Sequence, residues 1–212
     1  MDSFSTNMLK TFDNCPFKYY LKFIEKISMP QNPEIFEKGK KIHALANYYH
    51  RGNDISKLET ALNDSEKNIW ENLKNNEYFS KQCIKSEYPI TAKIDNVWIF
   101  GRLDAIVKDG ENYFILDYKT GSIPKNPEFD FQTMIYLICA DLILKEKKSL
   151  SFVYIDLKNN ENKIIEFTQT LKEQYQTILK QKCHEISSIQ NFTEKKNSQH
   201  CMFCEYKKIC NQ

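Results

Sequence analysis

The stretch from Gly101 to Gly121, GRLDAIVKDGENYFILDYKTG, decides the fold of this chain. Two runs rich in β-branched and aromatic residues, 97–107 and 112–119, flank an Asp-Gly turn signal, which predicts two neighbouring strands in a hairpin-like pair. Side chains alternate along a strand, so Asp117 and Lys119 point the same way. The pattern therefore gathers Asp104, Asp117 and Lys119 at one point.

These three side chains are the parts that a metal-dependent phosphodiesterase needs. A hard divalent cation binds carboxylates, backbone carbonyls and water, and it lowers the pKa of the bound water. We expect Asp104, Asp117 and the backbone carbonyl of Tyr118 to be ligands, and Lys119 to orient the attacking water or stabilise charge on the phosphate. The alternative is an ordinary surface hairpin with scattered charges, because a D-x-K triplet is weak by itself.

Composition indicates a globular chain that can form one domain. It has 212 residues, of which 41% are hydrophobic and 27% charged. The net charge of +2 gives no general basic field, so any nucleic-acid contact must come from a local groove. No signal peptide or membrane-spanning segment is evident, and we expect a cytoplasmic protein without membrane contact.

The cysteines indicate a second metal site. Cys201, Cys204 and Cys210 form C-x2-C-x5-C, and Cys15 stands alone near the other end. Four thiolates suit a tetrahedral zinc ion or an iron-sulfur cluster, and the spacing favours the cluster because structural zinc sites usually use two short-spaced pairs. The alternative is a buried Cys15 with the trio binding zinc, together with His200.

Apolar periodicity predicts helices around a sheet. Helices are expected over 5–12, 17–24, 34–49, 55–77, 129–145 and 168–187, and strands over 83–90, 97–107, 112–119, 151–157 and 163–167. The helix over 34–49 is expected to face the core through Ile35, Ile42, Leu45, Ala46 and Tyr49. The fold class is α/β, with a mixed sheet flanked by helices and a helical N-terminal portion.

A series of motifs in one order gives the chain a family resemblance. The motifs are S-x-x-x-L-x-x-F-x-x-C-P at 5–16, G-x-x-x-H at 39–43, G-x-x-D at 101–104, D-Y-K-T-G at 117–121, Q-x-x-x-Y at 132–136 and the terminal cysteine trio. The chain thus resembles the PD-(D/E)XK nuclease superfamily. In particular it is similar to the RecB-like iron-sulfur group, which includes the AddB nuclease domain and the CRISPR-associated exonuclease of the fourth Cas family.

The resemblance implies a catalytic set. In that family the histidine and both acidic residues ligate Mg²⁺ or Mn²⁺ and the lysine is catalytic, which corresponds here to His43, Asp104, Asp117 and Lys119. Glu87 matches an additional acidic position. The fold implied is a PD-(D/E)XK restriction-endonuclease-like core.

The resemblance also implies contacts with DNA and an iron-sulfur cluster. Gln132 and Tyr136 correspond to residues along the path of the DNA strand, although their spacing also suits a mere pair on one helix face. Arg102 shares the strand face of Asp104 and is expected to contact either a phosphate or a neighbouring carboxylate. The four cysteines match the positions that hold a 4Fe-4S cluster, which would join the N- and C-terminal segments.

These inferences define one working hypothesis. Residues 1–212 form a single RecB-like nuclease domain, with a helical portion over 1–80, a nuclease core over 81–187, and an iron-sulfur region over 188–212 with Cys15. We expect a metal-dependent deoxyribonuclease, an exonuclease on single-stranded DNA or DNA ends, in CRISPR adaptation or DNA repair and recombination, with proteins of those pathways as candidate partners. The alternatives are a DNA-end-binding or assembly subunit that uses the fold as a scaffold, and a zinc-ribbon nucleic-acid binder.

Overall fold

The computed structural model describes residues 2–30, 34–194 and 199–210. The first half of the described chain contains β1 (Ser3–Ser5), α1 (Thr6–Asn14), α2 (Pro16–Tyr19), the π-helical turn η1 (Tyr20–Ile24), α3 (Glu34–His50), α4 (Ser56–Thr60), α5 (Asp64–Lys74), β2 (Gln82–Ile94) and β3 (Val97–Asp109). The second half contains β4 (Asn112–Lys119), η2 (Pro127–Phe129), α6 (Phe131–Ile143), β5 (Ser149–Asp156), β6 (Glu161–Glu166), α7 (Gln169–Ser188), η3 (Gln199–Phe203) and α8 (Lys207–Cys210).

The strands form one mixed sheet with the order β1-β3-β4-β5-β6, and β2 pairs with the other edge of β3. β3 is antiparallel to both of its partners β2 and β4, whereas β4 and β5 are parallel. A parallel step needs a crossover connection, and α6 lies within it. β6 returns antiparallel to β5 at the edge of the sheet.

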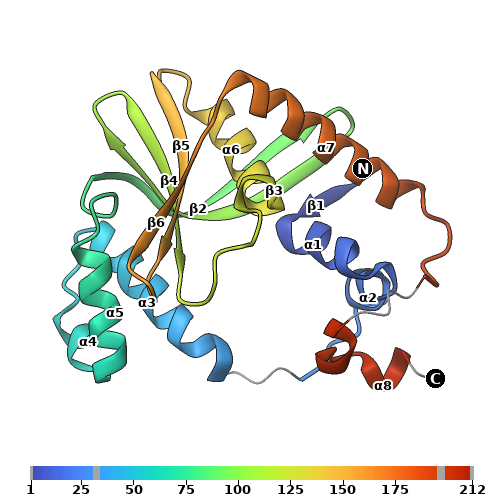
Figure 1. Cartoon of the computed structure of the whole chain (residues 1–212), viewed down its shortest axis with the longest axis horizontal. Helices are drawn as coiled ribbons and strands as arrows, with labels where there is room; N and C mark the ends of the chain where they lie inside the picture. Colours follow the sequence, from blue (N-terminus) through green and yellow to red (C-terminus); the bar gives the residue numbers. More distant parts are fainter. Residues whose placement is uncertain (1, 31–33, 195–198, 211–212) are drawn as a thin grey trace.

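Helices cover both faces of this sheet (Figure 1). Ile115 of β4 and Phe152 of β5 belong to the core cluster beneath α1, α6 and α7. Their neighbours Leu116 and Val153 belong to the cluster beneath α3 and α5. This alternation buries both faces and confirms the expected α/β fold with a mixed sheet flanked by helices.

The sheet opens next to β3. The ladder between β3 and β4 ends at the pair Ala105 and Leu116, and the earlier part of β3 pairs with β1 through Phe100 and Ser5. A strand has only two edges, and β2 occupies the other edge of β3. The two strands of the predicted hairpin therefore diverge at Asp104 and Asp117, directly where the sequence places the two carboxylates.

Two sequence predictions for the helices are wrong. The helix expected over 55–77 is two helices, because Asn63 and Glu66 form a capping box that starts α5 separately from α4. Tyr49 was expected to face the core but is 44% exposed. Ile42, Leu45 and Ala46 are buried as predicted, while the side chain of Ile35 lies outside the described residues.

The sequence reading also missed β1 and underestimated β2. β1 has only three residues and no alternation long enough to recognise. β2 continues to Ile94, four residues beyond the predicted end at Ile90, because it pairs with β3 as far as Val97. The helix cap at Ser5 is confirmed, since its Oγ accepts a hydrogen bond from the Met8 backbone N–H at 3.3 Å.

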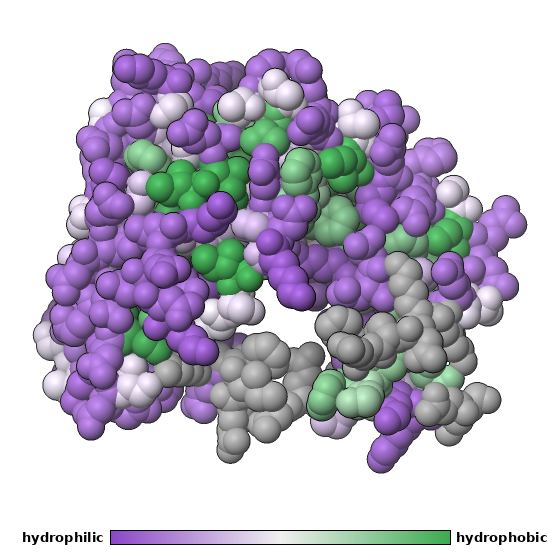
Figure 2. Space-filling model, viewed as in Figure 1, coloured by the Kyte–Doolittle hydropathy of each residue, from purple (hydrophilic) through white to green (hydrophobic). Residues whose placement is uncertain are grey.

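Hydrophilic side chains cover most of the face shown in Figure 2. That surface suits a sheet whose apolar sides are covered by helices. Among the helices that the structure describes, none has both the length and the apolar composition needed to cross a bilayer.

Candidate active site

The diverging ends of β3 and β4 form a cleft together with α3 and β2. His43 on α3, Glu87 on β2 and Asp104 on β3 each offer a ligand atom, and these atoms all lie within 4.8 Å of one another. Within the described parts of the chain, this is the one group of three or more His, Cys, Asp or Glu side chains that converges so closely. The structure thus joins a residue from the helical portion to two strands of the core.

His43 links Asp104 to the backbone of β4. Its Nδ1 lies 3.2 Å from the Asp104 carboxylate, and its Nε2 lies 2.9 Å from the Tyr118 carbonyl oxygen. Burial by itself lowers the pKa of His43, but hydrogen bonding and the charge of Asp104 raise it on balance to about 9. The Tyr118 carbonyl can only accept a hydrogen bond, so Nε2 is the donor in that contact and Nδ1 faces the Asp104 carboxylate.

Asp117 and Lys119 form a second part of the site. The Lys119 Nζ lies 2.7 Å from Asp117 Oδ2, and the Asp117 side chain is only 3% exposed. Burial raises the pKa of Asp117 to about 6, and the charge of Asp104 acts in the same direction, while Lys119 opposes the shift. The alternation expected for DYK is present, because Tyr118 points to the opposite core cluster.

Gln132 holds both of these side chains from α6. Its Nε2 donates to Asp117 Oδ1, and its Oε1 accepts from Lys119 Nζ at 3.2 Å. Asp130 caps α6 and accepts from the Gln132 backbone N–H at 2.8 Å, which fixes the first turn of the helix. The structure places Gln132 against Asp117 and Lys119; a contact between Gln132 and DNA stays a prediction.

Glu87 occupies a strained position beside the cleft. Its backbone φ is 45°, a left-handed value that costs a residue other than glycine about 1–3 kcal/mol. Its carboxylate lies 3.8 Å from the Arg102 guanidinium. Burial and the nearby charge of Asp104 raise the pKa of Glu87, while His43, Arg102 and Arg51 lower it. Of the two contacts expected for Arg102, with a phosphate or with a neighbouring carboxylate, the structure contains the second.

The donor atoms fit a hard divalent cation. Two carboxylates, one imidazole and a backbone carbonyl are ligand types that suit Mg²⁺ or Mn²⁺. Asp104 and His43 are partly exposed, with side-chain exposures of 13% and 28%, so an ion can reach them from the cleft. Asp117 lies outside the close group, and its two oxygens contact Lys119 and Gln132. Its role as a ligand stays a prediction.

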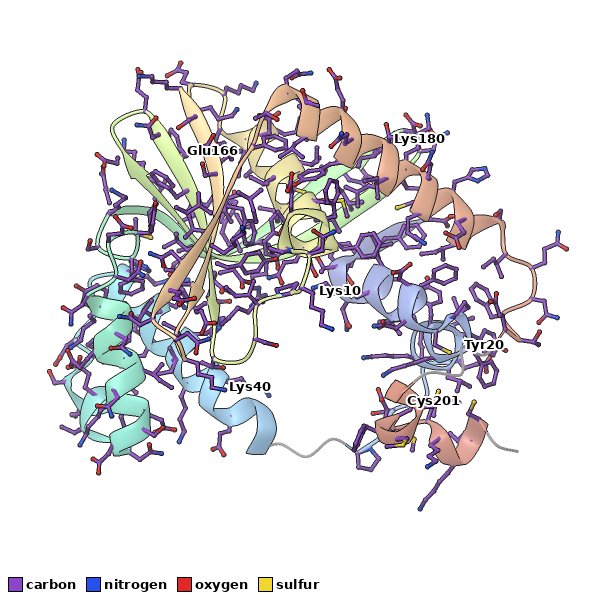
Figure 3. All side chains as sticks on the ribbon, in the orientation of Figure 1. Lys10, Tyr20, Lys40, Glu166, Lys180 and Cys201 are labelled. Carbon is purple, nitrogen blue, oxygen red and sulfur yellow. The ribbon has the colours of Figure 1, made fainter. Side chains whose placement is uncertain are left out.

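Cationic side chains line the cleft around His43, Glu87 and Asp104. The cleft has a volume of about 740 Å³, and its lining includes Lys40, Arg51 and Arg102. Arg51 and Arg102 are the two arginines of the chain. The sequence reading missed Arg51 as a site residue, although the scarcity of arginine was a signal that could have found it. Figure 3 shows Lys40 on α3 and Lys10 on α1 at facing sides of the open space between these helices.

Tyr136 lies beneath the site and not along its surface. It is 8% exposed, and its ring packs directly against the Gly101 backbone of β3. A Cβ at position 101 would lie 2.5 Å from the Tyr136 Cε1 atom, so the close approach requires glycine there. The predicted contact between Tyr136 and DNA has no exposed ring to support it here and stays a prediction.

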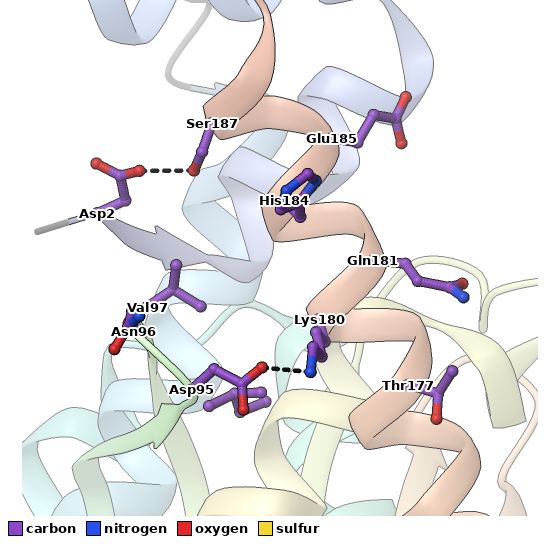
Figure 4. Close-up of a pocket in the computed structure, with 11 residues that line it drawn as sticks. Asp2, Asp95, Asn96, Val97, Thr177, Lys180, Gln181, His184, Glu185 and Ser187 are labelled. Atoms are coloured by element: carbon purple, nitrogen blue, oxygen red, sulfur yellow. Dashed lines mark hydrogen bonds and ion pairs between the residues drawn. The ribbon is translucent and has the colours of Figure 1, made fainter.

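A groove of about 930 Å³ lies elsewhere, between the β2–β3 turn and α7 (Figure 4). Its carboxylates have partners: Asp95 pairs with Lys180 at 2.6 Å, and Asp2 accepts from the Ser187 hydroxyl at 2.6 Å. No close group of metal-ligating side chains is found in it among the described residues. The converging group of metal-ligating side chains among the described residues therefore lies in the cleft at β3 and β4 and not in this groove.

The four predicted cluster ligands lie where the two ends of the chain meet. Cys15 caps α2, and its Sγ accepts from the Lys18 N–H at 3.4 Å, while Lys18 Nζ pairs with Glu205 at 2.8 Å. The Tyr206 hydroxyl donates to the Ile27 carbonyl at 2.7 Å, which ties the C-terminal segment to the N-terminal one. The cysteine trio is half-buried within that segment.

The sulfur atoms of these described cysteines do not form a close group. A tetrahedral zinc ion with bonds of about 2.3 Å would hold its sulfurs roughly 3.8 Å apart. No three of the described cysteines have sulfurs within 4.8 Å of one another. Among the described residues the structure therefore shows no zinc site of that kind. The 4Fe-4S cluster stays a prediction, and the side chain of His200 lies outside the described residues.

The chain is similar to a protein-family model and to solved structures. A family model described as the PD-(D/E)XK nuclease superfamily matches residues 3–93 and 69–211. A crystal structure of a protein from Eubacterium rectale, named "Putative exonuclease", is similar with a TM-score of 0.60 and 12% sequence identity, covering 99% of this chain and 87% of that chain. At that identity the likeness shows the fold alone.

Two further results complete the comparisons. The crystal structure of SSO0001 aligns with a TM-score of 0.46 and 16% identity, over 99% of this chain and 85% of that chain. That score is too low to support an argument. Among curated proteins, none matches this sequence.

Proposed function

The chain belongs to the PD-(D/E)XK nuclease superfamily, and on this premise we propose that it is a metal-dependent deoxyribonuclease, an exonuclease acting on single-stranded DNA or DNA ends. One observation carries the proposal: His43, Glu87 and Asp104 converge within 4.8 Å. The paired Asp117 and Lys119 stand on the adjoining strand. Carboxylates and imidazole around one point, with an ammonium beside them, suit phosphodiester hydrolysis.

Each residue has a proposed role in that reaction. A bound Mg²⁺ or Mn²⁺ would supply a water of lowered pKa and neutralise negative charge on the phosphate. Asp104, His43, Asp117 and the Tyr118 carbonyl would hold the ion, with Glu87 as a further acidic ligand. Lys119 presents its ammonium beside these oxygens, where it orients the attacking water or stabilises charge that develops on the phosphate.

Lys119 also favours the ionised form of the Asp117 carboxyl group. Its ammonium opposes the rise in the pKa of Asp117 that burial causes. A carboxyl kept ionised remains available as a ligand for a cation, whereas a protonated one does not. The lysine thus supports both the metal and the reacting phosphate.

The test is cleavage of a labelled single-stranded oligonucleotide by the purified protein with Mg²⁺ or Mn²⁺. Lys119→Met keeps the length of the side chain and removes its charge, so we expect cleavage to fall to background. Because Lys119→Met also leaves Asp117 buried without its partner, a thermal melt of the variant must show that the fold persists. Lys57→Met on α4, an exposed position, is the matched control and keeps full activity.

Two results would contradict the proposal. A folded wild-type protein that cleaves no DNA with either metal is not the proposed nuclease. If that protein still bound DNA ends, the scaffold alternative would replace it. Full activity of Lys119→Met would remove Lys119 from the catalytic set.

The proposal includes a 4Fe-4S cluster held by Cys15, Cys201, Cys204 and Cys210. The contacts of Lys18 with Glu205 and of Tyr206 with Ile27 support it, because they bring the two segments together. Anaerobically purified protein should be brown and contain iron, and Cys204→Ser should lose that iron. A colourless protein that binds zinc through these cysteines would contradict the cluster.

The biological setting is part of the proposal as well. DNA ends are substrates in CRISPR adaptation and in repair or recombination, and an exonuclease with this site would act there with partner proteins of those pathways. Genes adjacent to the coding sequence would distinguish these settings. Neighbouring spacer-integration genes would favour the first, and a recombination helicase the second.

A further inference from the structure

The catalytic cleft continues into a second groove at Thr120. The cleft with His43 and Asp104 includes Thr120 in its lining. A groove of about 800 Å³, lined by the segment after β4 and the turn between β5 and β6, also includes Thr120. The two hollows therefore adjoin at the residue that directly follows Lys119.

At this junction α3 lies close to the segment that follows β4. A Cβ at Gly39 of α3 would lie only 3.2 Å from the Thr120 Oγ1 atom. Glycine therefore allows α3 to approach the end of β4. The cleft lined by α3 and the second groove thus share the residue Thr120.

Six cationic side chains line these two adjoining hollows, and we call them the cation track. Three line the cleft and three line the second groove: Lys40, Arg51, Arg102, Lys125, Lys158 and Lys163. All six are exposed. In the part of the chain that the structure describes, Arg102 is the only member within ion-pair distance of a carboxylate, at 3.8 Å from Glu87.

Acidic residues do not cancel this charge in the second groove. Asp156 is 6% exposed, and its carboxylate accepts hydrogen bonds from the Lys158 N–H and the Asn159 N–H at 2.9 Å and 3.0 Å. Glu161 is the one exposed carboxylate among the described lining residues. The groove thus presents an excess of positive charge in a chain whose net charge is only +2.

No aromatic side chain lines either hollow among the described residues, apart from the imidazole of His43. Sequence-tolerant strand binding usually combines a positive groove with aromatic rings on which bases stack. Here the rings are missing and the cations remain. The ligand that fits is the phosphate backbone of a strand, bound without reading the bases.

We propose that the cation track binds the phosphates of a nucleic-acid strand on both sides of the bond that is cleaved, with Lys125, Lys158 and Lys163 holding the part beyond Lys119. This inference rests on the proposed function, since it assigns a path to the substrate of that site. Arg51 becomes a phosphate contact within the cleft. The second groove becomes the binding surface for several nucleotides.

Binding is tested separately from cleavage. A labelled 30-nucleotide oligo(dT) is titrated with protein in EDTA at several salt concentrations, by fluorescence anisotropy. In the triple variant Lys125→Gln, Lys158→Gln, Lys163→Gln, affinity falls. The slope of log K against log salt becomes less steep by about 2, since each lost contact to a single strand removes about 0.7.

Two matched variants serve as controls. Lys57→Gln, Lys145→Gln, Lys148→Gln removes the same charge from exposed positions outside both hollows and retains the wild-type slope. Replacing the three groove lysines by arginine also retains it. An unchanged slope in the groove variant, or an equal loss in the control, overturns the proposal.

Cleavage gives an independent readout. With Mn²⁺, the groove variant should lose kcat/KM on the 30-nucleotide substrate but not on bis(p-nitrophenyl) phosphate, which is too small to reach the groove. Equal losses on both substrates overturn the proposal. If wild-type protein hydrolyses neither substrate, the proposed function fails. The salt dependence of binding then still tests whether the cation track binds phosphates.

Discussion

The Asp104 carboxylate accepts a hydrogen bond from the Tyr118 backbone N–H at 2.9 Å. This bond stands where the ladder between β3 and β4 has ended, one residue beyond Ala105. A side chain thus replaces a backbone carbonyl and satisfies an N–H that the diverging strands leave unpaired. The same carboxylate faces His43 at 3.2 Å through its other oxygen, so Asp104 joins the fold to the site.

Two substitutions at Asp104 should separate these functions. Asp104→Asn retains an oxygen that can accept from Tyr118 but removes the charge, so stability should change little while metal-dependent cleavage is lost. Asp104→Leu also leaves the N–H unsatisfied and should cost about 1–3 kcal/mol more in the free energy of unfolding. Urea denaturation measures the difference, and equal stabilities of the two variants would argue against this role.

His43 provides a readout for the same substitution. Its pKa is about 9 because hydrogen bonding to Asp104 and the nearby charges outweigh burial. In Asp104→Asn the pKa should fall, since burial remains and the largest favourable partner loses its charge. An NMR titration of the imidazole measures the shift, and an unchanged pKa would contradict the assigned cause.

Gln132→Leu should reduce kcat by about 10- to 100-fold, because misplacement of catalytic groups carries costs of that order. The substitution releases Asp117 and Lys119, both of which Gln132 contacts. KM and the affinity for DNA should stay close to wild type if the residue positions catalytic groups. A large loss of DNA affinity with an unchanged kcat would instead support the DNA contact predicted from the sequence.

Gly101→Ala should destabilise the protein by about 1–3 kcal/mol, the usual cost of overpacking a filled core. The new Cβ would lie 2.5 Å from the Tyr136 Cε1 atom. Gly52→Ala is a control for backbone strain alone, because Gly52 has a φ of 70° and no atom near its Cβ position. Adding Tyr136→Leu should recover part of the loss at position 101, and no recovery would exclude the ring as its cause.

The pH dependence of stability should depend on Asp141 of α6, which is not part of the candidate site. Burial raises its pKa, but hydrogen bonds from Lys147 and Lys172 at 2.8 Å and 2.7 Å lower it on balance. A carboxyl with a lowered pKa stabilises the fold above its unfolded pKa, and that contribution is lost as pH falls through the folded pKa. Wild type should therefore exceed Asp141→Asn in stability at pH 7, and the gap should close on acidification below the ordinary carboxyl range. A gap that is constant with pH would contradict the ion pairs.

The sequence predicted most strands, and the shared face of Asp117 and Lys119, because those signals are local. Alternation within β4 places Asp117 and Lys119 on one side whatever surrounds them, and the Asp-Gly turn at 109–110 brings β3 beside β4. Helix ends were less predictable. The division at Asn63 depended on a capping box that competes with a continuous apolar pattern.

The roles of Gln132 and Tyr136 could not be read from their spacing. One turn apart on α6, both were candidates for the DNA path, yet Gln132 bonds to Asp117 while Tyr136 packs on Gly101. Which side chains a helix face meets depends on where the helix lies over the sheet. Periodicity predicts which residues share a face of the helix, but it does not predict which residues of the sheet that face will contact.

By itself the sequence determined a mixed α/β chain in which two carboxylates and a lysine follow one another on adjacent strands, since side-chain alternation and turn chemistry act over a few residues. Only the tertiary structure decided that β1 pairs with the part of β3 that β4 leaves free, that His43 reaches Tyr118 across 75 positions, and that Arg51 lines the same cleft. Those relations arise from the packing of α3 and β1 against the sheet. Packing brings together residues that are far apart along the chain, and local sequence patterns do not predict such contacts.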